Sequence, residues 1–177
     1  LERLLRDIER VVEQPDVGIW EKRDEPRLHT FTLLLHWVGA KLVAEIAGGR
    51  GQHGLRERAE DVVRRASAFI EQAWRPELGF FADAVDTTHP DASLLMMVNL
   101  GYLRSDDPRA HAHVDNTARM LRAGENLLFR YRHDDGLGET VAAFTVCGFW
   151  HAEALARLGR VDEARAVFEG LLGYANS

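Results

Sequence analysis

Apolar residues recur every three or four positions along most of the chain, a spacing that places them on one face of an α-helix. From this spacing we predict seven helices, at about residues 1–14, 30–46, 55–74, 89–103, 108–122, 141–159 and 161–175. The period-two alternation that is typical of strands is not sustained along the sequence. We therefore expect an all-α fold of about seven helices with no significant sheet.

The predicted helices are of two kinds. Residues 91–100 and 141–159 are apolar nearly all round, whereas 55–74 and 108–122 carry a face of arginines and glutamates. This alternation indicates an inner layer of helices backed by an outer layer, as in an α/α toroid or an α-solenoid. We treat residues 1–177 as a single all-helical domain. The apolar stripe that begins at Leu1 needs a covering surface, which fits a fragment of a larger catalytic domain or a processed N-terminus.

Composition and charge narrow the range of partners. The chain has 46% hydrophobic and 28% charged residues, which is typical of a globular protein. Its net charge of -6 argues against nucleic acid or an anionic membrane surface as a partner. No apolar run approaches the length of a membrane span, and the charged N-terminal segment is not a signal peptide. We expect no nucleic-acid partner and no membrane.

Cysteine and histidine usage bears on chemistry and location. The single cysteine, Cys147, excludes an intrachain disulfide and fits a reducing compartment, so we expect a cytoplasmic protein. Cys147 lies in an apolar helix, where a thiol normally only packs. His111 and His113 are two residues apart and point to different helix faces, so they make a poor ligand pair. We expect no metal and no cofactor.

Three predicted loops combine aromatic rings with carboxylates and arginines: "GIWEKRDEPR", "GFFADAVDTTHPDAS" and "FRYRHDDGLGE". Flat rings stack on sugars, and charged groups bind hydroxyls. A glycosidase also needs one protonated and one ionised carboxyl group. Glu21 stands beside Trp20, and an apolar wall favours the protonated form of a carboxyl group. These features are compatible with a sugar site whose acid is Glu21, but from the residues alone a helix cap or an ion pair is the more ordinary role for this glutamate.

Four blocks of sequence resemble a known family in order and spacing. "GIWEKRDEPRLHTFT", "PDASLL…GYLRSDDPRA", "FRYRHDDG" and "AAFTVCGFWHAEALARLGRVDEARAVFEGLLGYAN" resemble motifs of family 15 glycoside hydrolases, the glucoamylase, glucodextranase and bacterial trehalase group. The blocks extend from Gly18 to Asn176. The resemblance implies a partial (α/α)6 toroid of the six-hairpin type, corresponding to the later half of the catalytic ring.

The resemblance also implies site residues. It places Glu21 on the general acid, and it places the substrate-binding residues at Trp20, Arg27, His29, Arg130 and Tyr131. The family's general base lies beyond the "AN" motif, so we expect no base in this chain. Val141 stands where the family commonly has a glutamate. We expect part of an inverting α-glucoside hydrolase that acts on α-linked glucose oligosaccharides, with little activity in the isolated chain.

A second interpretation is an α-helical repeat module that binds a protein and has no catalytic activity. In it, Glu21 caps a helix or pairs with Arg23 or Arg27. Arg130 likewise pairs with Asp134 or Asp135. The enzyme interpretation predicts that Trp20, Glu21 and Arg130 converge, and the module interpretation predicts that they scatter. If the chain is part of a ring, the exposed flanks of its helices predict self-association.

Overall fold

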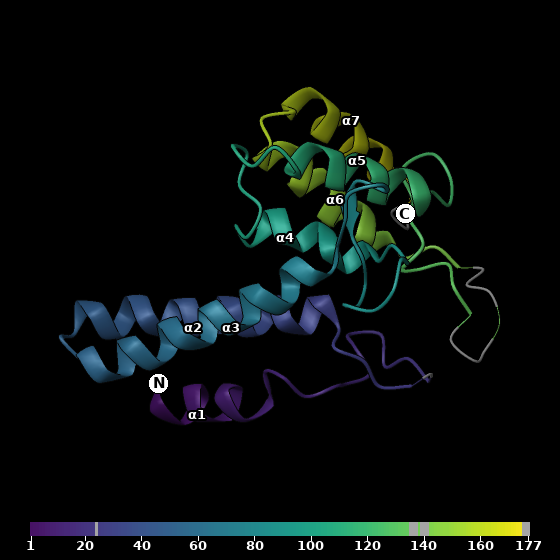
Figure 1. The fold of residues 1–177 in the computed structure, drawn as a ribbon. Coiled ribbons are helices and arrows are strands. Elements are labelled where there is room, and N and C mark those ends of the chain that lie inside the picture. Colours follow the sequence, from purple (N-terminus) through teal and green to yellow (C-terminus); the bar gives the residue numbers. More distant parts are fainter. Residues whose placement is uncertain (24, 135–137, 139–141, 175–177) are drawn as a thin grey trace. The chain divides into compact units, whose positions relative to one another are not determined.

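In a computed structural model of the protein, the described residues are 1–23, 25–134, 138 and 142–174. They form two compact units, unit 1 (Leu1–Ala73 and Ala84–Thr87) and unit 2 (Trp74–Asp83 and Thr88–Ser177). The described part contains seven α-helices and one short strand pair, so the predicted all-α class is confirmed (Figure 1). The prediction of a single domain over 1–177 stays a prediction.

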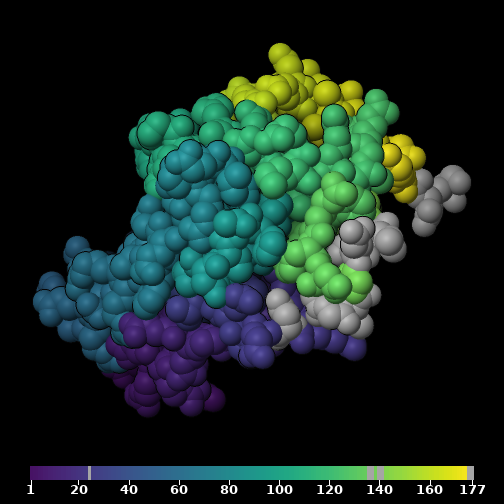
Figure 2. Space-filling view, turned by 45° about the vertical axis from the view of Figure 1, so that its right-hand side comes forward, coloured from purple at the N-terminus to yellow at the C-terminus, as the bar shows by residue number. Residues whose placement is uncertain are grey.

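Unit 1 is built from three helices: α1 (Glu2–Val11), α2 (Thr30–Gly49) and α3 (His53–Gln72). The helices α2 and α3 form an antiparallel hairpin, and α1 packs on both (Figure 1). Arg58 binds both carboxylate oxygens of Glu9 at 3.0 and 2.7 Å, which ties α3 to α1. In Figure 2 the purple surface of α1 lies against the blue surface of the same unit.

The buried face of α2 differs from the predicted one. The spacing within 30–46 predicts one apolar face made of Phe31, Leu34, Leu35, Val38, Leu42 and Ile46. Of these, Leu35, Leu42 and Ile46 are 47%, 51% and 41% exposed. The buried residues of α2 are instead Thr30, Phe31, Leu33, Leu34, Ala40, Val43, Ala44 and Ala47. Because α2 is apolar on most sides, spacing alone does not select the inward face. The face with three alanines is the buried one, and small side chains let neighbouring helices approach closely.

The helix α2 has the length and apolarity of a membrane span. The helix has 20 residues, and an 18-residue window within it reaches a mean hydropathy of 1.3, so the expectation that no apolar run approaches this length is wrong. One such helix near an N-terminus is a weak indication, because the core helix of a globular protein meets the same criterion. In this structure α2 packs against α1 and α3.

Unit 2 begins with a hairpin of two-residue strands, β1 (Trp74–Arg75) and β2 (Phe80–Phe81), paired antiparallel. A 3-10 helix, η1 (Ala92–Leu95), continues into α4 (Met96–Asn99) where one short helix was predicted. The remaining helices are α5 (Ala110–Met120), α6 (Thr145–Arg157) and α7 (Val161–Leu172). Asp91 caps η1 by accepting a 2.9 Å hydrogen bond from Ser93 N.

The core of unit 2 encloses a fully buried histidine. His113 Nδ1 accepts a hydrogen bond from Phe81 N at 3.2 Å, and His113 Nε2 lies 2.9 Å from Leu94 O. The carbonyl must accept, so Nε2 carries the proton and the ring is neutral. Burial, above all, lowers the pKa of His113 to about 4. His113 therefore joins β2, η1 and α5 in one core.

The helices α6 and α7 approach closely because Gly148 has no side chain. A Cβ atom at Gly148 would lie 2.7 Å from Leu171 Cδ2 and 2.8 Å from Asn126 O. The outer side of this helix pair carries two partly exposed rings, Phe149 and Phe168, whose centroids are 5.9 Å apart. The yellow helix α7 lies at the surface of unit 2 in Figure 2.

Candidate functional site

The loop that carries Glu21 is closed at its base by backbone pairing. Asp16 and Arg27 exchange two N–H···O hydrogen bonds of 2.9 Å, so the chain leaves and returns at one point. Within the loop, Lys22 N donates to Val17 O at 2.9 Å, and Lys22 is buried. Arg27 also forms an ion pair with Asp86 at 2.5 Å. The loop is therefore a fixed turn within unit 1.

Gly18 and His29 pack directly on each other. Gly18 has a φ of +69°, and a Cβ atom there would lie 3.2 Å from the His29 ring. Only glycine meets both requirements without strain. His29 is 3% exposed, and its Nε2 has no hydrogen-bond partner among the described residues. His29 thus supports the loop that begins at Gly18.

Glu21 has an unusual backbone and an uncommitted carboxylate. Its φ is +51°, and it is the only non-glycine residue with a positive φ in the described part of the chain. This region costs an L-residue about 1–2 kcal/mol, and such strain clusters at functional sites. The carboxylate makes no hydrogen bond or ion pair with a described residue, so the predicted pairing with Arg23 or Arg27 is not observed.

The surroundings of Glu21 match the sequence expectation in part. Trp20 beside it is half-buried, but Glu21 itself is exposed and is not walled in by apolar groups. Its role as the acid stays a prediction. Trp20 and Glu21 belong to unit 1 and Arg130 belongs to unit 2. Because the two units are described separately, the predicted convergence of these residues also stays a prediction.

Arg130 and Tyr131 lie in an irregular segment that contacts a second predicted loop. Arg130 O accepts a 2.9 Å hydrogen bond from Ala92 N, which joins the loops "GFFADAVDTTHPDAS" and "FRYRHDDGLGE". The guanidinium carbon of Arg130 lies 5.6 Å from the centroid of the Tyr131 ring, and Tyr131 is buried. Within unit 2, the structure therefore brings together two of the three loops that the sequence singled out.

No role was predicted for His133, whose ring lies 4.9 Å from the Tyr131 ring, or for its neighbours His89 and Asp83. The His89 and His133 rings stack at 4.6 Å, and His133 Nε2 lies 3.9 Å from Asp83 Oδ2. No motif indicates this group, because its members come from two loops and meet only in the folded unit. Val141 and Asp135 lie outside the described residues.

Cys147 is buried, as predicted for a packing residue. Burial, reinforced by the charge of Asp91, raises the pKa of the Cys147 thiol to about 12. The thiol therefore stays protonated at neutral pH and cannot act as a nucleophile.

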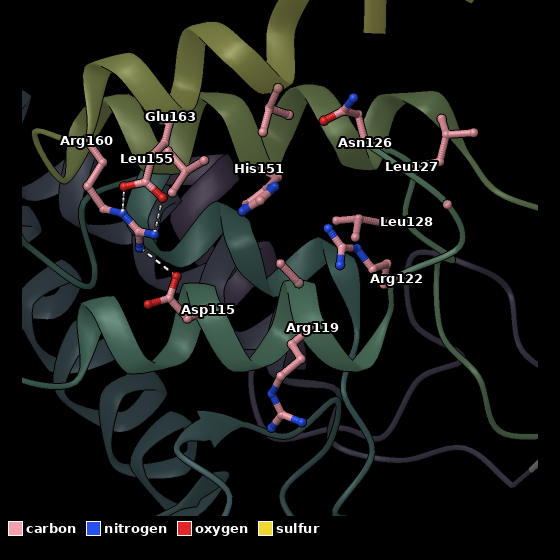
Figure 3. Close-up of a pocket in the computed structure, with 13 residues that line it drawn as sticks. Asp115, Arg119, Arg122, Asn126, Leu127, Leu128, His151, Leu155, Arg160 and Glu163 are labelled. Carbon is pink, nitrogen blue, oxygen red and sulfur yellow. Dashed lines mark hydrogen bonds and ion pairs between the residues drawn. The ribbon is translucent and has the colours of Figure 1, made fainter. Parts of the chain in front are cut away.

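Unit 2 also has a cavity of about 280 Å³ that none of the predicted site residues lines. Figure 3 shows Arg160, at the start of α7, reaching Asp115 on α5 and Glu163 on α7. The Arg160 nitrogens lie 2.6 Å from Asp115 and 2.7 Å from Glu163. His151 lines the same cavity, and burial lowers its pKa. Since Arg160 pairs with a carboxylate on each helix, the arrangement serves to tie α5 to α7.

Comparison with known proteins places the chain among glycosidases. It is 32% identical over 179 residues to a trehalase of Mycobacterium tuberculosis (strain ATCC 25618 / H37Rv), covering 98% of this chain and 26% of that protein. It is 26% identical over 179 residues to a trehalase of Thermoplasma volcanium, covering 99% of this chain and 28% of that protein. The chain thus spans about a quarter of the length of these curated relatives.

A solved structure described as "Glycosidase Wild Type" matches 91% of this chain and 41% of its own, with a TM-score of 0.76 and 20% identity. At this identity the likeness shows the fold, and the predicted partial α/α toroid is confirmed. The model of the glycosyl hydrolases family 15 matches residues 2–177. From the order of its motifs, its helical architecture and this match, the chain belongs to glycosyl hydrolase family 15.

Proposed function

We propose that the chain is part of an inverting hydrolase of α-linked glucose oligosaccharides, with Glu21 as its general acid. The observation that carries the proposal is the family match over residues 2–177, supported by relatives that are named trehalases. The alternative of a non-catalytic repeat module is not favoured, because the motifs that define the family cover this chain.

In the proposed reaction, the carboxyl group of Glu21 donates its proton to the glycosidic oxygen as the bond from that oxygen to the anomeric carbon breaks. A second carboxylate, from outside this chain, takes a proton from water, and the water oxygen bonds to the anomeric carbon from the opposite face. Inverting enzymes hold the two carboxyl groups about 6.5–9.5 Å apart to admit this water. The carboxylate of Glu21 makes no hydrogen bond or ion pair with a described residue, which supports the role because the group is open to a substrate.

The other proposed site residues act by binding or by holding the loop. Trp20 offers a half-buried ring for stacking on a glucose unit, and Arg130 offers N–H donors to hydroxyl groups. Tyr131 lies under the Arg130 guanidinium and orients it. Arg27 and His29 act through the loop, Arg27 through its ion pair with Asp86 and His29 through its contact with Gly18.

The proposal is tested by Glu21→Gln in the intact enzyme that contains this chain. The amide keeps the size of the side chain but has no acidic proton, so kcat/KM for trehalose and maltose should fall by about 10²–10⁴-fold. Glu25→Gln, an exposed glutamate of the same loop, is the matched control and should leave turnover unchanged. Normal turnover by Glu21→Gln removes Glu21 from the proposed role.

The isolated chain should have little or no hydrolase activity, because the proposed base lies outside it. Release of glucose from trehalose or maltose is the measurement. Robust turnover by the isolated chain that Glu21→Gln abolishes would contradict the missing base. We further propose a cytoplasmic, bacterial location, which the single buried Cys147 supports.

We also propose that the isolated chain self-associates through exposed apolar helix flanks. Leu35 and Leu42 on α2, and Phe149 and Phe168 on α6 and α7, are each between 38% and 51% exposed. Apolar side chains left in water favour association. Light scattering over a range of concentrations tests this, and a monomer at the highest concentration would count against it.

A further inference from the structure

Four side chains beside Arg130 form a continuous cluster in unit 2. The Tyr131 ring lies 4.9 Å from the His133 ring, and His133 stacks on His89 with centroids 4.6 Å apart and planes 22° apart. Asp83 Oδ2 lies 3.9 Å from His133 Nε2. Together with the Arg130–Tyr131 contact, these distances connect Arg130 to His89 through two rings. We call Asp83, His89, Tyr131 and His133 the histidine stack.

Burial in the histidine stack decreases from its base to its tip. The side chains of Asp83 and His133 are 3% and 12% exposed, and Tyr131 is 3% exposed. His89, at the outer end, is exposed, and its ring makes no hydrogen bond with a described residue. A buried carboxylate is costly unless it is paired, so Asp83 favours a His133 orientation that directs a nitrogen towards it. Only His89 offers open ring nitrogens to a ligand.

The backbone holds His89 in place although its side chain is exposed. Asp83 N donates a 2.9 Å hydrogen bond to His89 O, which closes the loop between them. The next loop is attached by the hydrogen bond from Ala92 N to Arg130 O. The backbone of His89 is therefore fixed while its ring is exposed to solvent. Because this segment is already ordered, less conformational entropy is lost when a ligand binds.

The chemistry of the histidine stack favours a neutral, hydroxylated ligand. An imidazole ring combines a flat face with one nitrogen that donates and one that accepts, which suits the alternating C–H and O–H groups of a sugar. The nearby Asp83 carboxylate disfavours an anion. A metal is disfavoured as well, because stacked rings hold their nitrogen lone pairs in nearly parallel planes that do not converge on one ion.

We infer that His89 is a substrate-contacting residue that binds a glucose unit beside Arg130, and that His133 and Asp83 are positioning residues that hold its ring. This inference rests on the proposed function for the class of ligand, α-linked glucose. It adds a contact at residues to which the family resemblance gives no role. Tyr131 links the new contact to the arginine.

The test is a sugar titration of the isotope-labelled chain, followed by NMR of the histidine ring signals. Trehalose and maltose should shift the His89 and His133 signals in a saturable way, and the β-linked disaccharide cellobiose should shift them less. His89→Ala should weaken binding about tenfold, as expected for the loss of one good hydrogen bond. His89→Gln, which keeps a donor and an acceptor, should recover part of this loss.

Two further variants separate contact from support. His111→Ala removes another exposed histidine of unit 2 and should leave the dissociation constant unchanged. Asp83→Asn should move the His133 nitrogen signals in the absence of sugar, because the charge facing Nε2 is lost, while the backbone spectrum stays that of the folded chain. A purely structural Asp83 would leave the His133 signals where they were.

The outcomes discriminate the two proposals. If trehalose binds, Arg130→Ala abolishes binding and His89→Ala binds as tightly as the unaltered chain, the inference is overturned and the proposed function stands. If no α-glucoside produces a saturable shift, the inference is overturned as well. Turnover by the Glu21→Gln variant of the intact enzyme decides the proposed function independently of either result.

Discussion

Glu21 in the loop of unit 1 and His113 in the core of unit 2 differ in the burial and the hydrogen bonding of their polar side chains. Glu21 is exposed and has a left-handed backbone, and its carboxylate pairs with none of the residues that the structure describes. His113 is fully buried and has both ring nitrogens in hydrogen-bond contact. A group that must exchange a proton with a substrate has to stay available, whereas a structural group is most stable when satisfied. This difference distinguishes a candidate catalytic residue, Glu21, from a structural residue, His113.

The largest expected effect is on the stability of the core of unit 2. Phe81 is fully buried, and its ring contacts the rings of Trp74 at 5.0 Å and His113 at 5.6 Å. Phe81→Ala should lower the free energy of unfolding by about 3–5 kcal/mol. Glu21→Ala, measured by the same urea titration, should change it by less than about 0.5 kcal/mol. Equal losses of unfolding free energy in the two variants would show that the Glu21 loop and the core of unit 2 do not differ in this way.

The next effect is a loss of stability in acid. The folded pKa of His113 is about 4, below its usual value of 6.5, so only the unfolded chain binds this proton between those pH values. Stability is complete above pH 6.5 and falls as pH decreases towards 4, by about 3 kcal/mol in total. Urea unfolding from pH 7 to 4 measures it. His113→Gln should be less stable at pH 7 but should lose less of its stability with acid, and an unchanged slope would exclude His113 as the cause.

A smaller effect concerns the base of the Glu21 loop. In Gly18→Ala, the alanine must adopt a φ of +69°, and its Cβ atom lies 3.2 Å from the His29 ring. The backbone cost alone is about 1–2 kcal/mol. Gly51→Ala is a matched control, because its φ is +68° and a Cβ there has nothing within 4 Å. Thermal unfolding should show a larger loss of stability for Gly18→Ala than for Gly51→Ala. Equal losses would mean that the His29 ring moves aside without a measurable energetic cost.

The smallest effect is a gain in stability at Glu21. In Glu21→Gly, the left-handed φ of +51° no longer costs energy, and this relief outweighs the extra entropy of glycine in the unfolded chain. We expect a gain of about 0.5–1 kcal/mol in the free energy of unfolding. Arg23→Gly, in the same loop, has no such strain to release and should give no gain. A loss in Glu21→Gly equal to that in Arg23→Gly would show that the backbone is not strained.

Much of the fold was predictable because helix formation depends on neighbours in sequence. The predicted start of α2 at Thr30 and the predicted break before α7 agree with the structure. The strand pair β1–β2 was missed, because two-residue strands are too short to show an alternating pattern. Which face of α2 is buried was missed for a different reason, since a helix that is apolar on most sides offers no contrast.

For the candidate site, the sequence provided the residue types and the structure provided their state. The motif around Gly18 predicted the Glu21 loop, but not the positive φ of Glu21 or the support from His29. The loops that carry Arg130 and His89 were both singled out, but the stacking of His89 on His133 was not. Such contacts depend on the path of the backbone between distant residues.

The sequence by itself determined the helical class, the order of the helices and the family. Periodicity and motif order depend only on the positions of residues along the chain. Only the tertiary structure decided that Glu21 is strained and uncommitted, that His113 is neutral and enclosed, and that His89 rests on His133. Burial, pairing and ring stacking are relations between residues that the chain brings together in space. A local sequence pattern therefore does not predict burial, pairing or ring stacking.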